Sequence, residues 1–302
     1  MKIIYSPKYE VDIGAHVFPT VKYRLIKERL ISGELACESD FIQPEKASLE
    51  NVALVHTKDY INKLNTGTLS YANLLKLELP YSKELAEAAF VCVGGTILTA
   101  RRSLNDKISV HLGGGFHHAY PDHGEGFCVF NDPAVAIRVL QKEGLIKKGL
   151  VFDVDLHQGN GTANIFDNDS TVFTFSIHQE QLYPLPKERS SLDIGLDAGT
   201  NDDVYIKHLE ESLPKIIKEF RPDFAIYLSG ADPYKFDQLG NLELSLSGLK
   251  RRDEFVLGEF YNSDIPVAVV FGGGYALNVL DTVEIHSNTV KAAYELVNRG
   301  KR

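Results

Sequence analysis

A short apolar run, Leu150-Val151-Phe152, leads directly into Asp153-Val154-Asp155-Leu156-His157, so that it ends in three ionisable side chains. Three other apolar runs end in a similar way, in glycine next to polar residues: 108–112 before 113–118, 224–228 before 229–232, and 267–270 before 271–275. Continuous runs of Val, Ile, Leu and Phe are typical of strands buried on both faces, as in a parallel sheet. Ligands bind such sheets at the carboxyl ends of the strands. The four endings therefore predict one shared functional site.

Predicted strands and helices alternate from about residue 107 onward. The expected strands cover 107–112, 149–154, 171–177, 223–228 and 266–270, and the expected helices cover 131–143, 161–167, 202–220, 247–261 and 284–298. Such alternation implies right-handed βαβ units and a parallel sheet. Long loops, which often carry function, are expected at 113–130, 178–200 and 231–246.

The first 105 residues are predicted to be mainly helical after a strand at 2–5. Helices are expected at 21–35, after the capping residue Thr57, and at 82–104. The chain contains no internal repeat and no Pro- or Gly-rich linker. The predicted fold class is therefore α/β, with residues 1–302 as a single domain: a parallel β-sheet flanked by helices, with its site at the strand carboxyl ends.

The composition of the 302 residues is that of an ordinary globular protein, with 44% hydrophobic and 24% charged residues. A net charge of −9 argues against direct nucleic-acid binding and favours cationic substrates. No run approaches the roughly 18 apolar residues of a membrane span, so no membrane partner is expected. Three widely spaced cysteines and the absence of a signal-peptide pattern favour a cytoplasmic location, or a nuclear one in a eukaryote. The oligomeric state is not predicted.

Asp153, Asp155 and His157 are spaced to project from the same face of an extended segment. Buried carboxylates are costly unless a cation or hydrogen bonds compensate them. Asp232 supplies a further carboxylate from another strand end. Two oxygens and one imidazole with an open fourth position form the ligand set of a catalytic zinc. Asp155 and His157 could alternatively cap the next helix, but together with Asp232 and the histidine pair they favour a metal site.

A second metal ion is not expected at this site. A binuclear site would need an acid two residues after His157, where Gly159 stands, and another two residues before Asp232, where Gly230 stands. The sequence therefore predicts one zinc ion per chain.

His117 and His118 follow three glycines, and adjacent side chains point in different directions, so each needs its own partner. Asp153 is expected to orient one ring and Asn160 the other. An imidazole near neutrality can act as a general base toward water. The alternative, a histidine that only completes the core, is less compatible with a paired motif in this loop.

Tyr275 follows the glycines 272–274 and could place its hydroxyl on a developing oxyanion. It could equally be an aromatic residue that packs against the sheet. Gly126 and Phe127 are expected to line an entrance for an extended aliphatic chain, with Tyr183-Pro184 as the opposite wall.

These motifs together resemble the zinc-dependent histone deacetylase superfamily, whose members have the arginase-deacetylase fold. The resemblance rests on Gly113-Gly-Gly-Phe-His117-His118, Gly126-Phe127-Cys128-Val-Phe-Asn131-Asp132, Asp153-Val-Asp155-Leu-His157-Gln-Gly159-Asn160-Gly161, Ser176-Ile-His178, Gly230-Ala-Asp232 and Gly272-Gly-Gly-Tyr275. The motifs occur in the family's order. The stretches 199–205 and 238–254, with Gln158-Gly159-Asn160, look most like the class IV branch.

The resemblance implies a role for each matched position. Asp155, His157 and Asp232 would ligate zinc, His118 would be the main general base and acid, Asp153 would orient the paired His117, and Tyr275 would bind the amide carbonyl. Gly126, Phe127 and Gly273 would contact the substrate, and Lys22 matches a basic residue beneath the tunnel. A structural potassium ion would use Asp153 and Ser176 with the backbone of Asp155, His157 and Ile177. Asn160 stands where class I members have aspartate, and this neutral partner should make His118 less basic.

The expected reaction is hydrolysis of an N-acyl amide, with an acetyl or longer acyl group on the N6 atom of lysine. The partner would be an acyl-lysine protein or a small acylated amine. One alternative is an acetylpolyamine amidohydrolase. A second is a non-catalytic acyl-lysine binding module, although a binder would not need the complete set of ligands, histidines and tyrosine.

Overall fold

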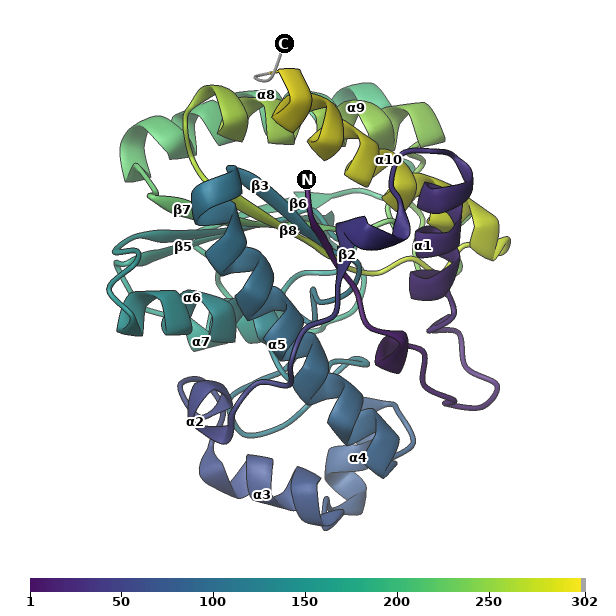
Figure 1. Cartoon of the computed structure of the whole chain (residues 1–302), viewed down its shortest axis with the longest axis vertical. Helices are drawn as coiled ribbons and strands as arrows, with labels where there is room; N and C mark the ends of the chain where they lie inside the picture. Colours follow the sequence, from purple (N-terminus) through teal and green to yellow (C-terminus); the bar gives the residue numbers. More distant parts are fainter. Residues whose placement is uncertain (300–302) are drawn as a thin grey trace.

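The computed structural model describes residues 1–299, in which eight parallel strands form one sheet with helices on both faces (Figure 1). The strands are β1 (Ile3–Ile4), β2 (Phe41–Ile42), β3 (Ile108–His111), β4 (Gly149–Asp153), β5 (Val172–Gln179), β6 (Leu192–Leu196), β7 (Phe224–Ser229) and β8 (Val267–Phe271). Their order across the sheet is β2-β1-β3-β8-β7-β4-β5-β6, and every neighbouring pair is parallel. The predicted fold class is confirmed.

Helices form a layer on each face of the sheet. They are α1 (Lys22–Ser32), α2 (Leu49–Val52), α3 (Lys58–Thr66), α4 (Tyr71–Leu77), α5 (Lys83–Asp106), α6 (Asp132–Lys142), α7 (Asn160–Ile165), α8 (Asp202–Phe220), α9 (Leu246–Asn262) and α10 (Val279–Arg299), with short 3-10 turns η1 (Pro7–Tyr9) and η2 (Glu38–Asp40). Figure 1 shows α8, α9 and α10 on one face and α5, α6 and α7 on the other. None of the helices in residues 1–299 is both long and apolar enough to cross a membrane.

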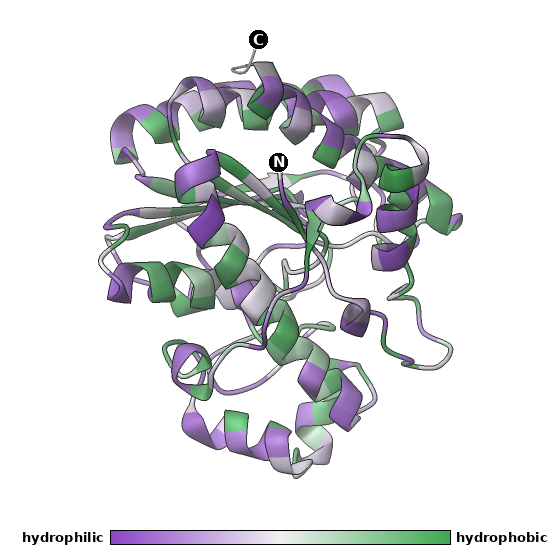
Figure 2. Ribbon diagram, in the orientation of Figure 1, coloured by the Kyte–Doolittle hydropathy of each residue, from purple (hydrophilic) through white to green (hydrophobic). Residues whose placement is uncertain are grey.

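The central strands are buried because they lie between the two helical layers. β4, β7 and β8 have no exposed residue, and Figure 2 shows hydrophobic residues concentrated in these strands. Phe152 of β4 stacks on Phe175 of β5, with ring centroids 4.2 Å apart. Dense packing of this kind holds the strand ends in fixed relative positions.

Local sequence signals set most helix starts. The Thr57 side chain accepts a hydrogen bond from the backbone N–H of Tyr60, which confirms the predicted cap of α3. Ser82 caps α5 in the same way through Leu85. α10 begins at Val279, five residues before the predicted start at 284.

The expectation that 178–200 is a loop throughout was wrong, because this segment contains β6. The strand sequence, Leu192-Asp193-Ile194-Gly195-Leu196, is no continuous apolar run, since β6 is an edge strand that pairs only with β5 and is mostly half-buried. The edge strand β2 was missed because its two residues, Phe41 and Ile42, are too few to form a recognisable run.

Candidate functional site

The polar strand endings meet at one edge of the sheet. Strands β3, β8, β7 and β4 are consecutive neighbours, so the residues that follow them come together. Asp153 is the last residue of β4, and Asp155 and His157 follow it directly. Asp232 comes three residues after the end of β7, and Tyr275 four residues after the end of β8. Strand order in the sheet thus joins segments that are far apart in the sequence.

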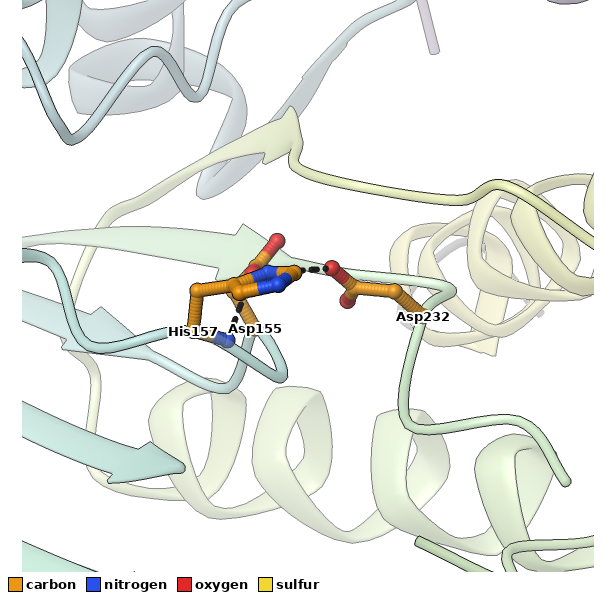
Figure 3. Close-up of side chains that lie close together, drawn as sticks. All are labelled: Asp155, His157 and Asp232. Atoms are coloured by element: carbon orange, nitrogen blue, oxygen red, sulfur yellow. Dashed lines mark hydrogen bonds and ion pairs between the residues drawn. The ribbon is translucent and has the colours of Figure 1, made fainter. Parts of the chain in front are cut away.

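Asp155, His157 and Asp232 form a compact cluster, with one potential ligand atom from each within 4.8 Å of the others (Figure 3). His157 Nδ1 lies 3.2 Å from Asp155 Oδ1 and 3.2 Å from Asp232 Oδ2. Three ligands at about 2.1 Å from a tetrahedral ion would lie roughly 3.4 Å apart. The spacing of these atoms therefore fits a single metal ion.

Burial makes the two carboxylates of this cluster costly unless positive charge or hydrogen bonds compensate them. Asp155 and Asp232 are each 1% exposed, and His157 is 7% exposed. Burial and the charge of Asp155 raise the pKa of Asp232 to about 7. Burial alone would lower the pKa of His157, but its hydrogen bonds with the two carboxylates outweigh this and raise it to about 10. The cluster therefore concentrates buried negative charge that a bound cation would compensate.

Backbone groups hold the two carboxylates in place. Asp155 Oδ2 accepts a hydrogen bond from the N–H of Gly273 at 2.6 Å, and Asp232 Oδ1 accepts one from the N–H of Leu156 at 3.1 Å. Gly273 belongs to the glycine segment that follows β8. This segment therefore positions the cluster of Asp155, His157 and Asp232 as well as Tyr275.

The two adjacent histidines have different partners. His117 Nδ1 lies 2.6 Å from Asp153 Oδ2, and His118 Nδ1 lies 2.6 Å from Asn160 Oδ1. Both rings are buried, with centroids 4.1 Å apart. Each ring is thus held through Nδ1; this leaves His118 Nε2 available for chemistry, whereas His117 Nε2 lies 3.7 Å from Asp155 Oδ1.

The environments of the two histidines shift their pKa values in opposite directions. Burial would lower the pKa of His117, but the charges of Asp153 and Asp155 outweigh it and raise the pKa to about 9. Burial, together with the charges of His117 and His157, holds the pKa of His118 well below its ordinary value. Two neighbouring groups with opposite shifts are typical of acid–base sites.

The loop that carries the histidines requires glycine. Gly115 has a φ of +77°, and a Cβ there would lie 2.6 Å from the carbonyl oxygen of Phe271. A side chain would therefore be both strained and in collision with the end of β8. The absence of a side chain lets the end of β3 approach β8 closely enough to bring His117 and His118 to the site.

A pocket opens onto these groups. Its lining residues are Phe18, Tyr23, Gly114, Gly115, Phe116, His117, His118, Gly126, Phe127, Cys128, Asp155, His157, Phe271, Gly272, Gly273 and Tyr275. Gly126, Phe127 and Gly273, the three residues predicted to contact substrate along the chain of the acyl-lysine, are all among them. Tyr183, predicted as the opposite wall, is not among these lining residues, although its ring packs against His118 with centroids 5.1 Å apart.

Lys22 lies fully buried beside the pocket. Its Nζ donates a hydrogen bond to the carbonyl oxygen of Gly272 at 2.9 Å and lies 5.9 Å from the ring centroid of Tyr275. Burial lowers the pKa of Lys22 to about 8, although Asp232 and Asp155 act in the opposite direction. Lys22 thus contributes a positive charge next to the carboxylate cluster and anchors the glycine segment.

Of the residues predicted for potassium, Asp153, Ser176 and Ile177 lie on two adjacent strands, whereas Asp155 and His157 follow the end of β4. Asp153 of β4 and Ser176 of β5 are paired in the sheet, and Ile177 is the next residue of β5. Ser176 Oγ lies 2.9 Å from His178 Nδ1, and Asp153 Oδ1 accepts a hydrogen bond from the N–H of Asp155 at 3.0 Å. Both side chains already have partners within the protein, so the potassium site stays a prediction.

Two acidic residues that hold the site received no role from the sequence. Asp132 accepts hydrogen bonds from the N–H groups of Gly115 and Phe116, which fixes the loop before His117. Asp237 accepts one from the N–H of Tyr275 at 2.7 Å. Asp132 stands in a motif, next to Asn131, but Asp237 lies in a long loop without any local signal.

Comparison with known proteins places these residues in a family context. The sequence model of the histone deacetylase domain matches residues 16–290. An uncharacterized protein of Picosynechococcus sp. is 39% identical over 97% of this chain and 98% of its own length. Acetoin utilization protein AcuC of Bacillus subtilis is 32% identical over 81% of this chain and 69% of its own length. Histone deacetylase 2 of Arabidopsis thaliana is 29% identical over 94% of this chain and 78% of its own length.

Solved structures agree in fold. The crystal structure of the HDA15 HD domain superposes with a TM-score of 0.84, at 23% identity, over 97% of this chain and 88% of that chain. A histone deacetylase homologue crystallised with SAHA superposes with a TM-score of 0.82, at 26% identity, over 98% of this chain and 84% of that chain.

Proposed function

This chain belongs to the histone deacetylase family, and we propose that it is a zinc-dependent deacylase acting on N6-acyl-lysine in proteins or peptides. Family membership follows from the match over residues 16–290; the lysine substrate, the zinc ion and the residue roles are parts of the proposal. One observation carries it: a cluster suited to a metal, two separately oriented histidines and a tyrosine meet at one pocket.

Asp155, His157 and Asp232 would hold the metal ion. Their short separations and deep burial support this assignment, and zinc suits a set of two carboxylates and one imidazole. When bound, the ion would supply a Lewis acid for the substrate carbonyl and lower the pKa of a water molecule in the site.

His118 is proposed as the general base and acid. Asn160 Oδ1 can only accept, so the hydrogen of the neutral ring lies on Nδ1 and Nε2 keeps a free lone pair. Nε2 would take a proton from the water that attacks the acyl carbon, and would give a proton to the leaving amine as the C–N bond breaks. His117, held by Asp153, would be its supporting partner.

Tyr275 is proposed to donate a hydrogen bond to the substrate oxygen as it gains negative charge. Its place in the pocket wall and the hydrogen bond that holds its backbone to Asp237 support this role. Gly126, Phe127 and Gly273 would contact the extended part of the substrate.

The acyl group is proposed to be acetyl or longer. A second, mostly apolar cavity adjoins the site, and Phe18, Phe116 and Phe127 line both cavities. An acetylated polyamine is the alternative substrate, since a net charge of −9 favours a cationic amine.

We also propose membership of the class IV branch and a cytoplasmic location. The first rests on the stretches 199–205 and 238–254, and the second on three cysteines that form no disulfide.

The test is a substrate comparison on the purified, zinc-loaded protein. Acetyl-lysine peptide, myristoyl-lysine peptide and an N-acetylated polyamine would be assayed for release of the free amine. We expect the peptides to be hydrolysed, and an Asp155→Asn variant of similar shape to be inactive. If the protein preferred the polyamine, the proposed substrate would be an acetylated polyamine and not acyl-lysine. The proposed function would be contradicted if the metal-loaded protein hydrolysed none of the substrates.

A further inference from the structure

Glu125 lies next to the pocket and contacts the residue that orients His118. Its Oε1 accepts a hydrogen bond from Asn160 Nδ2 at 2.8 Å and another from the hydroxyl of Tyr183 at 3.0 Å. Its Oε2 lies 3.3 Å from His123 Nε2. The side chain is only 19% exposed, so these contacts satisfy a carboxylate that is largely removed from water.

The Asn160 side chain is surrounded in a way that allows one amide orientation. Both hydrogens of its Nδ2 face acceptors, Glu125 Oε1 at 2.8 Å and the Tyr120 hydroxyl oxygen at 3.2 Å. The Tyr120 hydroxyl donates its own hydrogen to Glu188 Oε1 at 3.0 Å, so toward Asn160 it can only accept. Rotating the amide by 180° would place Oδ1 against the Glu125 carboxylate, where two acceptors would repel each other.

This orientation determines which nitrogen of His118 carries the hydrogen. Asn160 Oδ1 lies 2.6 Å from His118 Nδ1, and an amide oxygen is only an acceptor. The hydrogen of the neutral ring must therefore lie on Nδ1. Nε2 is then unprotonated, which is the form that a general base requires.

We propose that Glu125 is a positioning residue, which fixes the Asn160 amide and through it the reactive tautomer of His118. Glu125 touches neither the substrate nor the reacting atoms and acts through Asn160. The kinetic part of this inference rests on the proposed deacylase function, whereas the tautomer part concerns the protein alone.

Two further observations support the assignment. Burial would raise the pKa of Glu125, but hydrogen bonds from His123, Asn160 and Tyr183 outweigh it and lower the pKa, so the side chain is an acceptor-only carboxylate. The same carboxylate also holds Tyr183, whose ring packs against His118 at a centroid distance of 5.1 Å. Glu125 thus fixes both the ring's hydrogen-bond partner and one of its packing partners.

The first experiment is a charge exchange between positions 125 and 160. Glu125→Gln keeps the shape but offers an N–H as well as an oxygen, so the Asn160 amide is no longer forced into one orientation. We expect kcat to fall about tenfold, which is less than the full rate contribution of a positioned general base. KM should stay within about threefold of the wild-type value. Asn160→Asp would place a carboxylate against Glu125, and kcat/KM should fall further, by about 100-fold.

The double variant Glu125→Gln/Asn160→Asp removes this repulsion, because an amide at 125 can donate to the new carboxylate. Its kcat/KM should recover at least about tenfold over Asn160→Asp alone, a coupling that independent structural effects would not produce. Glu78→Gln is the control: it removes one exposed negative charge near Glu125 from the segment before it, its side chain makes no hydrogen bond with Asn160, and it should leave kcat unchanged.

The second experiment observes the tautomer directly. Nitrogen-15 NMR of zinc-loaded, histidine-labelled protein, with the His118 signals assigned by their loss in His118→Gln, distinguishes Nδ1–H from Nε2–H. We expect only Nδ1–H in the wild type and a mixture of the two in Glu125→Gln.

The two readouts separate the possible failures. The proposed function would be refuted if the wild-type protein hydrolysed none of the acyl substrates. The positioning role would still be supported if the His118 tautomer differed between the wild type and Glu125→Gln. A wild-type tautomer in Glu125→Gln would overturn the inference whatever the activity, as would a double variant no better than Asn160→Asp.

Discussion

Replacing Gly273 with alanine tests whether the glycine segment positions the cluster of Asp155, His157 and Asp232, the proposed metal ligands. A Cβ at this position would lie 2.6 Å from Asp232 Cγ and 2.9 Å from Tyr275 Cε2, whereas ordinary contact begins at 3.4 Å. Asp232 Oδ2 would lie closer still, so the Asp232 carboxylate would have to move by more than about 0.8 Å, and the Tyr275 ring by about 0.5 Å, to accept one methyl group. Productive sites tolerate displacements of roughly 0.5 Å.

The expected losses follow from these displacements. A misplacement of about 1 Å can cost roughly 100-fold in rate, so kcat/KM should fall by about that factor. Metal affinity should fall about 10- to 100-fold, as it does when the groups that orient metal ligands are changed. Metal affinity would be measured by competition with a coloured chelator, which does not depend on any substrate, and kcat/KM with the best acyl-lysine peptide.

Gly258→Ala in α9 is the control, because a Cβ there would meet no atom within 4 Å. It should leave both quantities unchanged. If Gly273→Ala bound metal within threefold of the wild-type affinity and kept full activity, the methyl group would have been accommodated without moving Asp232. The reasoning from close packing at this position would then be refuted.

Three further predictions concern other parts of the protein. Tyr275→Phe should preserve the fold and reduce kcat by roughly 100- to 1,000-fold, the effect of losing one oxyanion donor, and near-full activity would make Tyr275 a packing residue. A strong chelator should abolish activity and added zinc should restore it, while two bound equivalents at the site would contradict a single-metal centre. Buried His56 contacts the Tyr120 carbonyl and the Asn131 N–H, and burial lowers its pKa from 6.5 to about 4. The unfolded chain therefore binds a proton at this position more readily than the folded chain does. As a result, the free energy of unfolding should fall by about 3 kcal/mol as the pH decreases from above 6.5 to 4. Denaturant titrations should show a flatter pH dependence for His56→Gln over this range, and an equal slope would exclude His56 as the cause.

Local sequence patterns were sufficient to predict the main strands and to identify Asp155, His157 and Asp232 as one cluster. The runs that became β4, β7 and β8 are buried on both faces, so their sequences are largely apolar and can be recognised without a structure, whereas buried β3 also contains Ser109 and His111. The alternation of Asp155 and His157 along one extended segment indicated a shared face, and the fold class followed from strand–helix alternation. The edge strand β6 was not predicted, because a strand with one exposed side has no continuous apolar run.

The sequence by itself determined which chemical groups are present and that they follow the ends of buried strands, because side-chain chemistry and hydrophobic periodicity are local properties. Only the tertiary structure decided which further groups support them. Glu125 and Asn160 are 35 residues apart, and Asp237 and Tyr275 are 38 apart, yet each pair is joined by a hydrogen bond. A hydrogen bond requires its two atoms to lie within about 3 Å. Distances of that size between remote loops are set by the packing of the whole sheet and its helices, which no local pattern encodes.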